Sequence, residues 1–229
     1  MTQYYGRIAA SYVLGKYQSQ IPARLNNKSL KDLGDDNIEF LLDIGKKKDD
    51  SFFMFKRSMI VPRISCVLGF LHSLEFSTIL DIGSGRGNFI FPFMEEFSHV
   101  KIISADIQQE KVDIFNSINK GGIKSIQGTN QDATNLNFEN NSFDVVTALE
   151  VLEHIQNAKK AFNELIRVAK EYIIISVPSK EDDNPEHIHL FTKEVFIGWI
   201  TENNSLTYKM KEVKDHLIII VKKLHQNVR

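Results

Sequence analysis

The feature that most constrains this chain is a short apolar strand that runs directly into a glycine-rich turn. The strand is expected at residues 78–82, and the turn reads Gly83-Ser84-Gly85-Arg86-Gly87 before a helix expected to reach residue 97. Glycines let backbone N–H groups approach a ligand, and the N-terminus of a helix favours an anionic group. This order predicts a ligand-binding loop at the carboxyl end of a strand, where open α/β sheets bind their ligands. A purely structural turn is the alternative.

From about residue 77 onward, segments with strand character alternate with segments of helical character. Further strands are expected at residues 100–105, 123–127, 143–149, 172–177, 206–213 and 216–224. Helices are expected at residues 109–120, 158–170 and 193–201. Nearly continuous apolar strands that alternate with helices are typical of a parallel sheet covered on both faces. We therefore expect an α/β fold with a doubly wound, mostly parallel seven-stranded sheet and a closing antiparallel strand.

The segment of residues 1–75 has a different character, with no strand signal of comparable strength. Apolar residues recur at helical spacing at Ile60, Ile64, Val67, Leu68 and Leu71. A chain of 229 residues is long enough for one α/β domain with an appendage. We therefore expect an N-terminal helical extension, or substrate cap, over residues 1–75 and an α/β ligand-binding domain over residues 76–229.

The overall charge and the cysteine count exclude several classes of protein. A formal net charge of -1 and a pI near 6.7 give no overall basic field for nucleic acid or anionic lipid. Cys66 is the single cysteine, so neither a disulfide framework nor zinc-type cysteine spacing is present. No basic, apolar leader is recognisable, and the longest apolar runs fall far short of the roughly 20 residues that span a bilayer. We expect a soluble, cytoplasmic protein with no membrane partner, and the oligomeric state stays open.

Three aspartates accompany the glycine-rich turn. Asp81 lies two residues before its first glycine, and Asp106 ends the next strand, where a carboxylate can accept both hydroxyls of a ribose. Asp132 follows the third strand and is placed to bind the exocyclic amine of an adenine, with a loop or cap aspartate as the alternative. The G-x-G-x-G spacing differs from the G-x-G-x-x-G of dinucleotide folds, which disfavours a nicotinamide-dependent oxidoreductase.

These motifs carry a resemblance to a known family. Asp81-Ile-Gly-Ser-Gly-Arg-Gly, Asp106, Asp132-Ala133 and the segment from Phe143 to His154 stand in order along the chain. Together they resemble class I S-adenosylmethionine (SAM)-dependent methyltransferases with a methyltransferase type 11-like domain, over about residues 77–180. The resemblance implies that residues 76–229 form a Rossmann-like, SAM-binding methyltransferase domain.

The resemblance also implies which positions bind SAM, namely Asp81, Gly83, Gly85, Gly87, Asp106, Ile107, Asp132, Ala133 and Glu150. The backbone of the glycines would run alongside the methionine part of SAM, and Asp81 and Glu150 would lie close to that part of the cofactor. Asp106 would bind the ribose. Ile107 would pack on the adenine, and Asp132 with Ala133 would bind the adenine edge.

Two carboxylates and an imidazole follow the fourth strand as Glu150, Glu153 and His154. If a helical turn begins at Glu150, all three side chains lie on one face. Such a group is a candidate site for Mg²⁺ or another divalent metal, with His189 as a fourth ligand. A metal there would lower the pKa of a substrate hydroxyl.

The alternative needs no metal, because Glu150 can serve SAM alone and His154 can cap or orient its loop. Glu150, His154, His187 and His189 are the candidate catalytic residues, and the three histidines are candidates for acid–base catalysis because the charge of histidine changes near neutral pH.

The cluster after the fourth strand is similar to that of two methyltransferase subfamilies. Glu150-x-x-Glu153-His154 is similar to the cluster of ubiquinone-pathway O-methyltransferases. With a downstream histidine, Phe191-Thr192 and Trp199, it is also similar to small-RNA 3′-terminal 2′-O-methyltransferases. The chain departs from the RNA subfamily in its short loop before the histidines and in its lack of a marked basic surface.

We therefore expect an enzyme that transfers a methyl group from SAM to an oxygen of a small or medium-sized acceptor, with nitrogen as the lesser alternative. A metal-dependent RNA 2′-O-methyltransferase and a non-catalytic methyltransferase-like binding subunit are the competing hypotheses.

Overall fold

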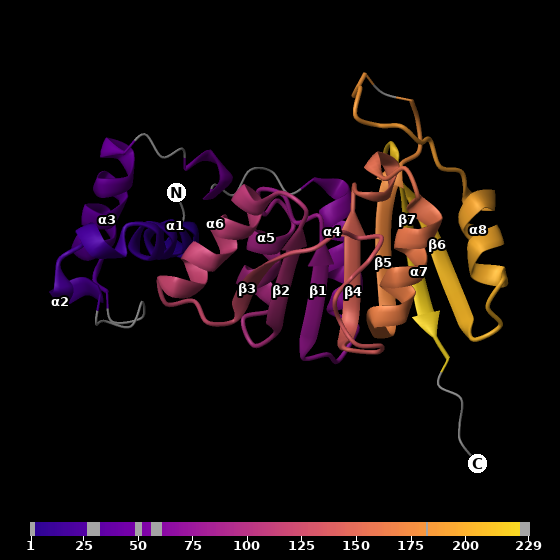
Figure 1. The fold of residues 1–229 in the computed structure, drawn as a ribbon, viewed down its shortest axis with the longest axis horizontal. Helices are drawn as coiled ribbons and strands as arrows, with labels where there is room; N and C mark the ends of the chain where they lie inside the picture. The colour runs from indigo at the N-terminus through magenta and orange to yellow at the C-terminus, as the bar shows by residue number, and fades with distance from the viewer. Residues whose placement is uncertain (1–2, 27–32, 49–51, 56–60, 182, 225–229) are drawn as a thin grey trace, which may run out of the picture. The chain divides into compact units, whose positions relative to one another are not determined.

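The computed structural model of the chain describes residues 3–26, 33–48, 52–55, 61–181 and 183–224. Seven strands form a mixed sheet in the order β3-β2-β1-β4-β5-β7-β6 (Figure 1). The chain divides into two compact units, Met1–Ile60 with Ser84–Asn130 and Val61–Gly83 with Gln131–Arg229. Among the described residues, no helix combines the length and the apolar character that a bilayer span requires.

The first unit contains one pair of strands and most of the N-terminal helices. Its elements are α1 (Gln3–Lys16), η1 (Gln18–Gln20), α2 (Ala23–Asn26), α3 (Asp35–Lys47), η3 (Phe53–Phe55), α5 (Ile90–Glu96), β2 (Lys101–Asp106), α6 (Gln109–Lys120) and β3 (Ile126–Asn130). β2 and β3 pair in parallel, and α1 lies along α6 (Figure 1). Helix α6 buries Val112, Phe115 and Ile118, whose helical spacing places them on one face.

The second unit contains the other five strands. Its elements are α4 (Pro62–Leu71), β1 (Thr78–Ile82), β4 (Phe143–Leu149), η4 (Leu152–His154), α7 (Ala158–Val168), β5 (Ala169–Pro178), α8 (Lys193–Thr201), β6 (Leu206–Val213) and β7 (His216–Lys223). β1, β4 and β5 run parallel and consist largely of buried apolar residues, as the sequence predicts for strands covered on both faces.

The sheet is mixed because β7 runs antiparallel to both of its neighbours. It pairs with β5 on one side and with β6 on the other. The prediction of a mostly parallel α/β sheet with a closing antiparallel strand is therefore confirmed in outline. Five elements, β1, β4, β6, α6 and α8, also have the bounds that the sequence predicts.

The third strand was misplaced by the sequence pattern. It was expected at residues 123–127 and lies at Ile126–Asn130. Ile123 instead closes the end of α6, where its N–H donates to the carbonyl of Ile118. The strand itself is largely polar, and its pairing with β2 decides its position.

The expected boundary at residue 75 does not coincide with the division of the structure. Residues 1–60 belong to the first unit, whereas α4 belongs to the second. The described N-terminal segments are helical, as predicted. The role of residues 1–75 as a substrate cap stays a prediction.

Candidate functional site

In the first unit, the carboxylate of Asp106 fixes the glycine-rich loop. Its Oδ2 accepts the N–H of Gly85 at 3.0 Å, and its Oδ1 accepts the N–H of Gln108 at 2.9 Å. Asp106 ends β2 and is buried, so both oxygens are held in place. Each oxygen has a further lone pair. The carboxylate is therefore preorganised and can still accept hydroxyl donors, as expected for a ribose-binding residue.

Ile107 presents a large apolar side chain directly after this carboxylate. It is 67% exposed, which is unusual for isoleucine. Its backbone is held by Asn130, whose side-chain amide donates to the carbonyl of Ile107 at 2.8 Å. An exposed apolar side chain on a fixed backbone suits the flat face of a ring such as adenine.

The three glycines of the loop all adopt left-handed backbone conformations, with φ of +67° at Gly83, +52° at Gly85 and +85° at Gly87. At Gly83 a Cβ atom would lie 2.5 Å from Cγ2 of Val151. A side chain at this position would therefore collide as well as strain the backbone. The loop geometry requires glycine, which fits the close backbone approach to a ligand that the sequence predicts.

Asp81 and Asp132 of the second unit both accept hydrogen bonds from other residues of that unit. Asp81 is buried on β1, and its Oδ1 accepts the hydroxyl of Thr147 on the adjacent strand at 2.6 Å. Asp132 is exposed, and its Oδ1 accepts the N–H of Thr134 at 2.8 Å, as in a turn-forming aspartate. Ala133 beside it is buried. The structural alternative for Asp132 thus has support, and the cofactor roles of these residues stay predictions.

Glu150 lies directly after β4 in a network of polar side chains. Its Oε2 is 3.0 Å from Nε2 of His216, and its Oε1 accepts the hydroxyl of Ser176 at 2.7 Å. Nε of Arg63 lies 3.7 Å from Oε1. The backbone of Glu150 has φ of +61°, a conformation that costs non-glycine residues on the order of 1–3 kcal/mol and is frequent at functional sites.

The helical turn that was expected to begin at Glu150 does not form. The positive φ of Glu150 turns the chain, and only Leu152–His154 make a short 3-10 turn. The carboxylate of Glu150 is therefore directed to His216 and Ser176. Neither partner was predictable from sequence, because both follow from the pairing of β5 and β7, which places Ser176 and His216 two rungs apart and so on the same face of the sheet.

A second cluster joins Glu153, His154 and His187. One ligand atom of each lies within 4.8 Å of the others, and Glu153 is fully buried. Nδ1 of His154 lies 2.9 Å from the carbonyl oxygen of Glu186, so the ring is oriented through that nitrogen. The rings of His154 and His187 meet edge to face, with centroids 4.7 Å apart.

The predicted set of four metal ligands is not the set that converges. Of Glu150, Glu153, His154 and His189, the described structure groups only Glu153 and His154, and adds His187. Nε2 of His189 lies 3.0 Å from the carbonyl oxygen of Ile155 instead. The backbone explains the arrangement, since the carbonyl of Glu153 accepts the N–H groups of both Ile188 and His189 and so holds the histidine segment against the cluster.

Comparisons with known proteins bear on these features. A family model described as a methyltransferase domain matches residues 75–216. The uncharacterized methyltransferase YcgJ of Bacillus subtilis is 27% identical over 111 residues, which are 45% of this chain and 42% of that protein. The ubiquinone/menaquinone biosynthesis C-methyltransferase UbiE of Hydrogenovibrio crunogenus is 29% identical over 108 residues, 43% of this chain and 42% of UbiE. The similarity thus spans less than half of either relative.

The fold is shared with solved structures. A SAM-dependent methyltransferase from Aquifex aeolicus superposes with a TM-score of 0.58 and 23% sequence identity, covering 80% of this chain and 98% of that one. At this identity the likeness concerns the fold.

Proposed function

The chain belongs to the methyltransferase domain family, and from that membership we propose that it transfers a methyl group from SAM to an oxygen of a small or medium-sized acceptor. The observation that carries the proposal beyond the family is the pair formed by Glu150 and His216 at the end of β4. A carboxylate that orients an imidazole is suited to remove a proton from a hydroxyl.

The residues of the glycine loop and β2 fit SAM as the cofactor. SAM supplies an activated methyl group on a sulfonium sulfur. Asp106 would accept the ribose hydroxyls with the lone pairs that Gly85 and Gln108 leave unused. Ile107 would pack against the adenine, and the glycine backbone would lie along the methionine part. The chain's contribution is mainly to bind, orient and exclude water.

The pair of Glu150 and His216 would act on the acceptor. Nε2 of His216 lies 3.0 Å from Oε2 of Glu150 and 3.4 Å from Nη1 of Arg63. In the tautomer that donates from Nε2 to Glu150, Nδ1 is the ring nitrogen able to take a proton. Loss of that proton makes the acceptor oxygen nucleophilic. The guanidinium of Arg63 lies beside the carboxylate and would contribute positive charge to an oxyanion that forms next to this pair.

The atom that is methylated can be read directly from the product. We would incubate the protein with SAM labelled with ¹³C in its methyl group and with a panel of small phenols, catechols and amines. The ¹³C shift of the product methyl separates oxygen, nitrogen and carbon acceptors. Because UbiE is named a C-methyltransferase, a carbon-bound methyl is the principal competing result. It would overturn the oxygen assignment but not methyl transfer.

A divalent metal at Glu153, His154 and His187 is a second candidate feature, favoured by the convergence of their ligand atoms. The contact between Nδ1 of His154 and a backbone carbonyl leaves Nε2 free to bind a metal. Mn²⁺ and Zn²⁺ would be titrated calorimetrically into chelator-treated protein and into a His187→Gln variant. Heat of binding that is lost in the variant supports the site. If neither the parent protein nor the variant binds metal, the proposed metal site is wrong.

An RNA acceptor and a non-catalytic role remain the competing functions. RNA binding would weaken steeply as salt is raised. A non-catalytic subunit would form no methylated product under any condition, whether or not it binds SAM. A small-molecule acceptor predicts product formation with little dependence on salt.

A further inference from the structure

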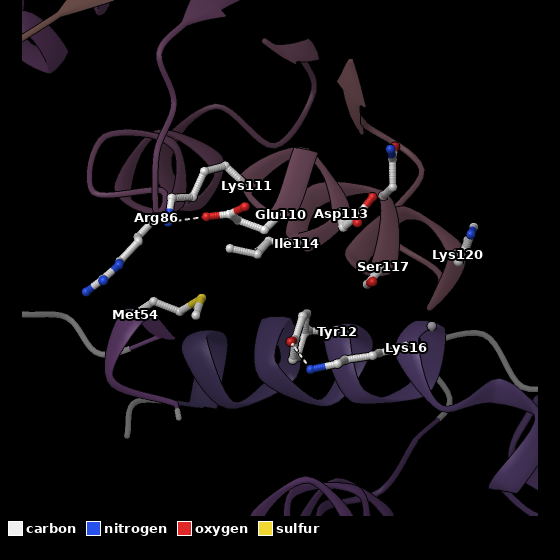
Figure 2. A pocket seen from close by; sticks show the side chains of 12 residues that line it. Tyr12, Lys16, Met54, Arg86, Glu110, Lys111, Asp113, Ile114, Ser117 and Lys120 are labelled. Atoms are coloured by element: carbon white, nitrogen blue, oxygen red, sulfur yellow. Dashed lines mark hydrogen bonds and ion pairs between the residues drawn. The ribbon is translucent and has the colours of Figure 1, made fainter. Parts of the chain in front are cut away.

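A pocket of about 620 Å³ opens in the first unit between α1, η3 and α6. Its volume lies in the range of small-molecule sites. Figure 2 shows Tyr12 of α1 facing Ile114 of α6 across the pocket. Met54 of η3 and Arg86 of the glycine loop lie toward one end. None of the cofactor or catalytic residues proposed above lines this pocket.

The frame of the pocket is fixed by a close approach of α1 to α6. A Cβ atom at Gly15 would lie 1.9 Å from the carbonyl oxygen of Ser117. The hydroxyl of Ser11 donates to the carbonyl of Ile118 at 2.7 Å. The two helices are thus held at backbone contact distance beside the pocket, so the pocket is a preformed feature of this unit.

The side chains that line the pocket carry more positive than negative charge. The cations are Lys16, Arg86, Lys111 and Lys120, and the carboxylates are Glu110 and Asp113. Lys111 and Glu110 form a long ion pair of 3.8 Å. Within the described parts of the chain, neither Arg86 nor Lys120 has a hydrogen-bond or ion-pair partner.

The middle of the pocket is apolar and aromatic. Tyr12, Met54 and Ile114 contribute a ring, a thioether and a branched side chain. The ammonium of Lys16 is held at this surface, since Nζ donates to the hydroxyl of Tyr12 at 2.7 Å and lies 5.1 Å from the centre of its ring. Figure 2 shows Arg86 and Lys120 toward opposite ends of the pocket. An apolar middle with cationic ends is complementary to an organic anion.

We propose that this pocket binds an organic anion with an aromatic or aliphatic body and a carboxylate, sulfonate or phosphate group. The apolar body would pack on Tyr12, Met54 and Ile114, and the anionic group would pair with Arg86 or Lys120. Because Arg86 stands between Gly85 and Gly87, a ligand bound to it would touch the glycine loop.

The experiment compares two fluorescent probes that differ in charge, 8-anilinonaphthalene-1-sulfonate and the uncharged N-phenyl-1-naphthylamine. We expect the sulfonate to bind the full chain about two- to fivefold more tightly than the neutral probe, as one weak charge contact allows. One of Arg86→Gln and Lys120→Gln, whichever removes the partner of the sulfonate, should weaken sulfonate binding about two- to fivefold, and neither should change binding of the neutral probe.

The matched control is Lys101→Gln, which removes an exposed cation of the same unit that does not line the pocket. It should leave both probes unaffected. Thermal unfolding and near-ultraviolet circular dichroism of each variant confirm that the protein is folded. Equal affinity for the two probes overturns the proposal. Sulfonate binding that SAM displaces, and that neither Arg86→Gln nor Lys120→Gln weakens, overturns it as well.

Discussion

The imidazole of His216 lies against the carboxylate of Glu150, with Nε2 3.0 Å from Oε2. The two residues come from the beginning of β7 and the end of β4. Ser176 of β5 donates to the other oxygen of the same carboxylate. Side chains from β5, from β7 and from the residue that follows β4 therefore meet at one acidic group of the second unit.

Removing the imidazole should reduce turnover and spare SAM binding. His216→Asn is expected to lower kcat about 10²-fold, the lower end of what a general base contributes. The Kd for SAM should stay within about threefold, because the proposed base acts on the acceptor. His99→Asn, at an exposed position of the first unit, is the matched control. Equal loss of SAM affinity and kcat would assign His216 to cofactor binding instead.

Neutralising Asp106 should weaken SAM binding. Asp106→Asn removes a charge-assisted acceptor for the ribose and disturbs the N–H contacts of Gly85 and Gln108. We expect the Kd for SAM to rise about 10- to 100-fold, which corresponds to one or two charged hydrogen bonds. Asp183→Asn, in an exposed loop, serves as the control in the same calorimetric titration. An unchanged Kd would exclude Asp106 from the cofactor site.

Asp144 should make stability depend on pH in the acidic range. Burial alone would raise the pKa of its carboxyl, but hydrogen bonds from the backbone and hydroxyl groups of Ser77 and Thr78 lower the pKa from 3.8 to about 2. The native state thus holds the charged form more strongly than the unfolded chain does. The resulting stabilisation is present above the unfolded pKa near 3.8 and is lost as pH falls through about 2.

Urea unfolding of Asp144→Asn checks this linkage. At pH 7 the variant should be less stable than the parent by about 2 kcal/mol, and the difference should shrink as pH falls from 4 toward about 2. Asp36→Asn, at an exposed position of α3, should show little change at either pH. A difference that stays constant down to pH 2 would contradict the assigned pKa.

Arg167 should hold the loop that carries Asp132. Its guanidinium donates to the carbonyl oxygens of Leu136 and Phe138 at 2.8 and 2.6 Å, and to Glu164 at 2.7 Å. The hydrogen bond from Arg167 is also the main reason that the pKa of Glu164 is lowered. Arg167→Met should cost about 2 kcal/mol of stability, since it leaves these acceptors without their charged donor.

Hydrogen exchange locates the effect of Arg167→Met. Amides of residues 131–142 should exchange faster in the variant, while those of α6 should not change. Arg24→Met removes an exposed arginine of α2 and is the matched substitution. If amide exchange is faster by the same factor across the whole chain, Arg167 supports global stability and has no particular role in the loop.

The part of the fold that was predictable from sequence is the part set by local patterns. β1 ends where Gly83 begins the loop, and β5 ends at Pro178, which cannot continue a strand ladder as a donor. β3 was misplaced because its apolar neighbour Ile123 is used to close α6, while the polar strand is placed by its partner β2. Local apolar content carries no information about such pairing.

The residues of the candidate site likewise fall into those that local sequence predicts and those that depend on distant strand pairing. Asp106 and the loop glycines were predictable because they belong to one strand–turn–helix segment. His216 was not, because its position beside Glu150 depends on the register of β7 against β5, in which His216 pairs with Pro178. The positive φ of Glu150 was equally hidden, since a non-glycine residue gives no local sign that it will turn the chain there.

The position of β7 between β5 and β6 determines the order in which this half of the sheet can assemble. β6 precedes β7 in the chain, yet it has no place on the sheet until β7 has paired with β5. Docking of the β6–β7 hairpin and delivery of His216 to Glu150 are therefore one event. The glycine loop precedes β7 by more than one hundred residues in the chain, whereas the pair of Glu150 and His216, for which proton transfer is proposed, forms only when β7 pairs with β5.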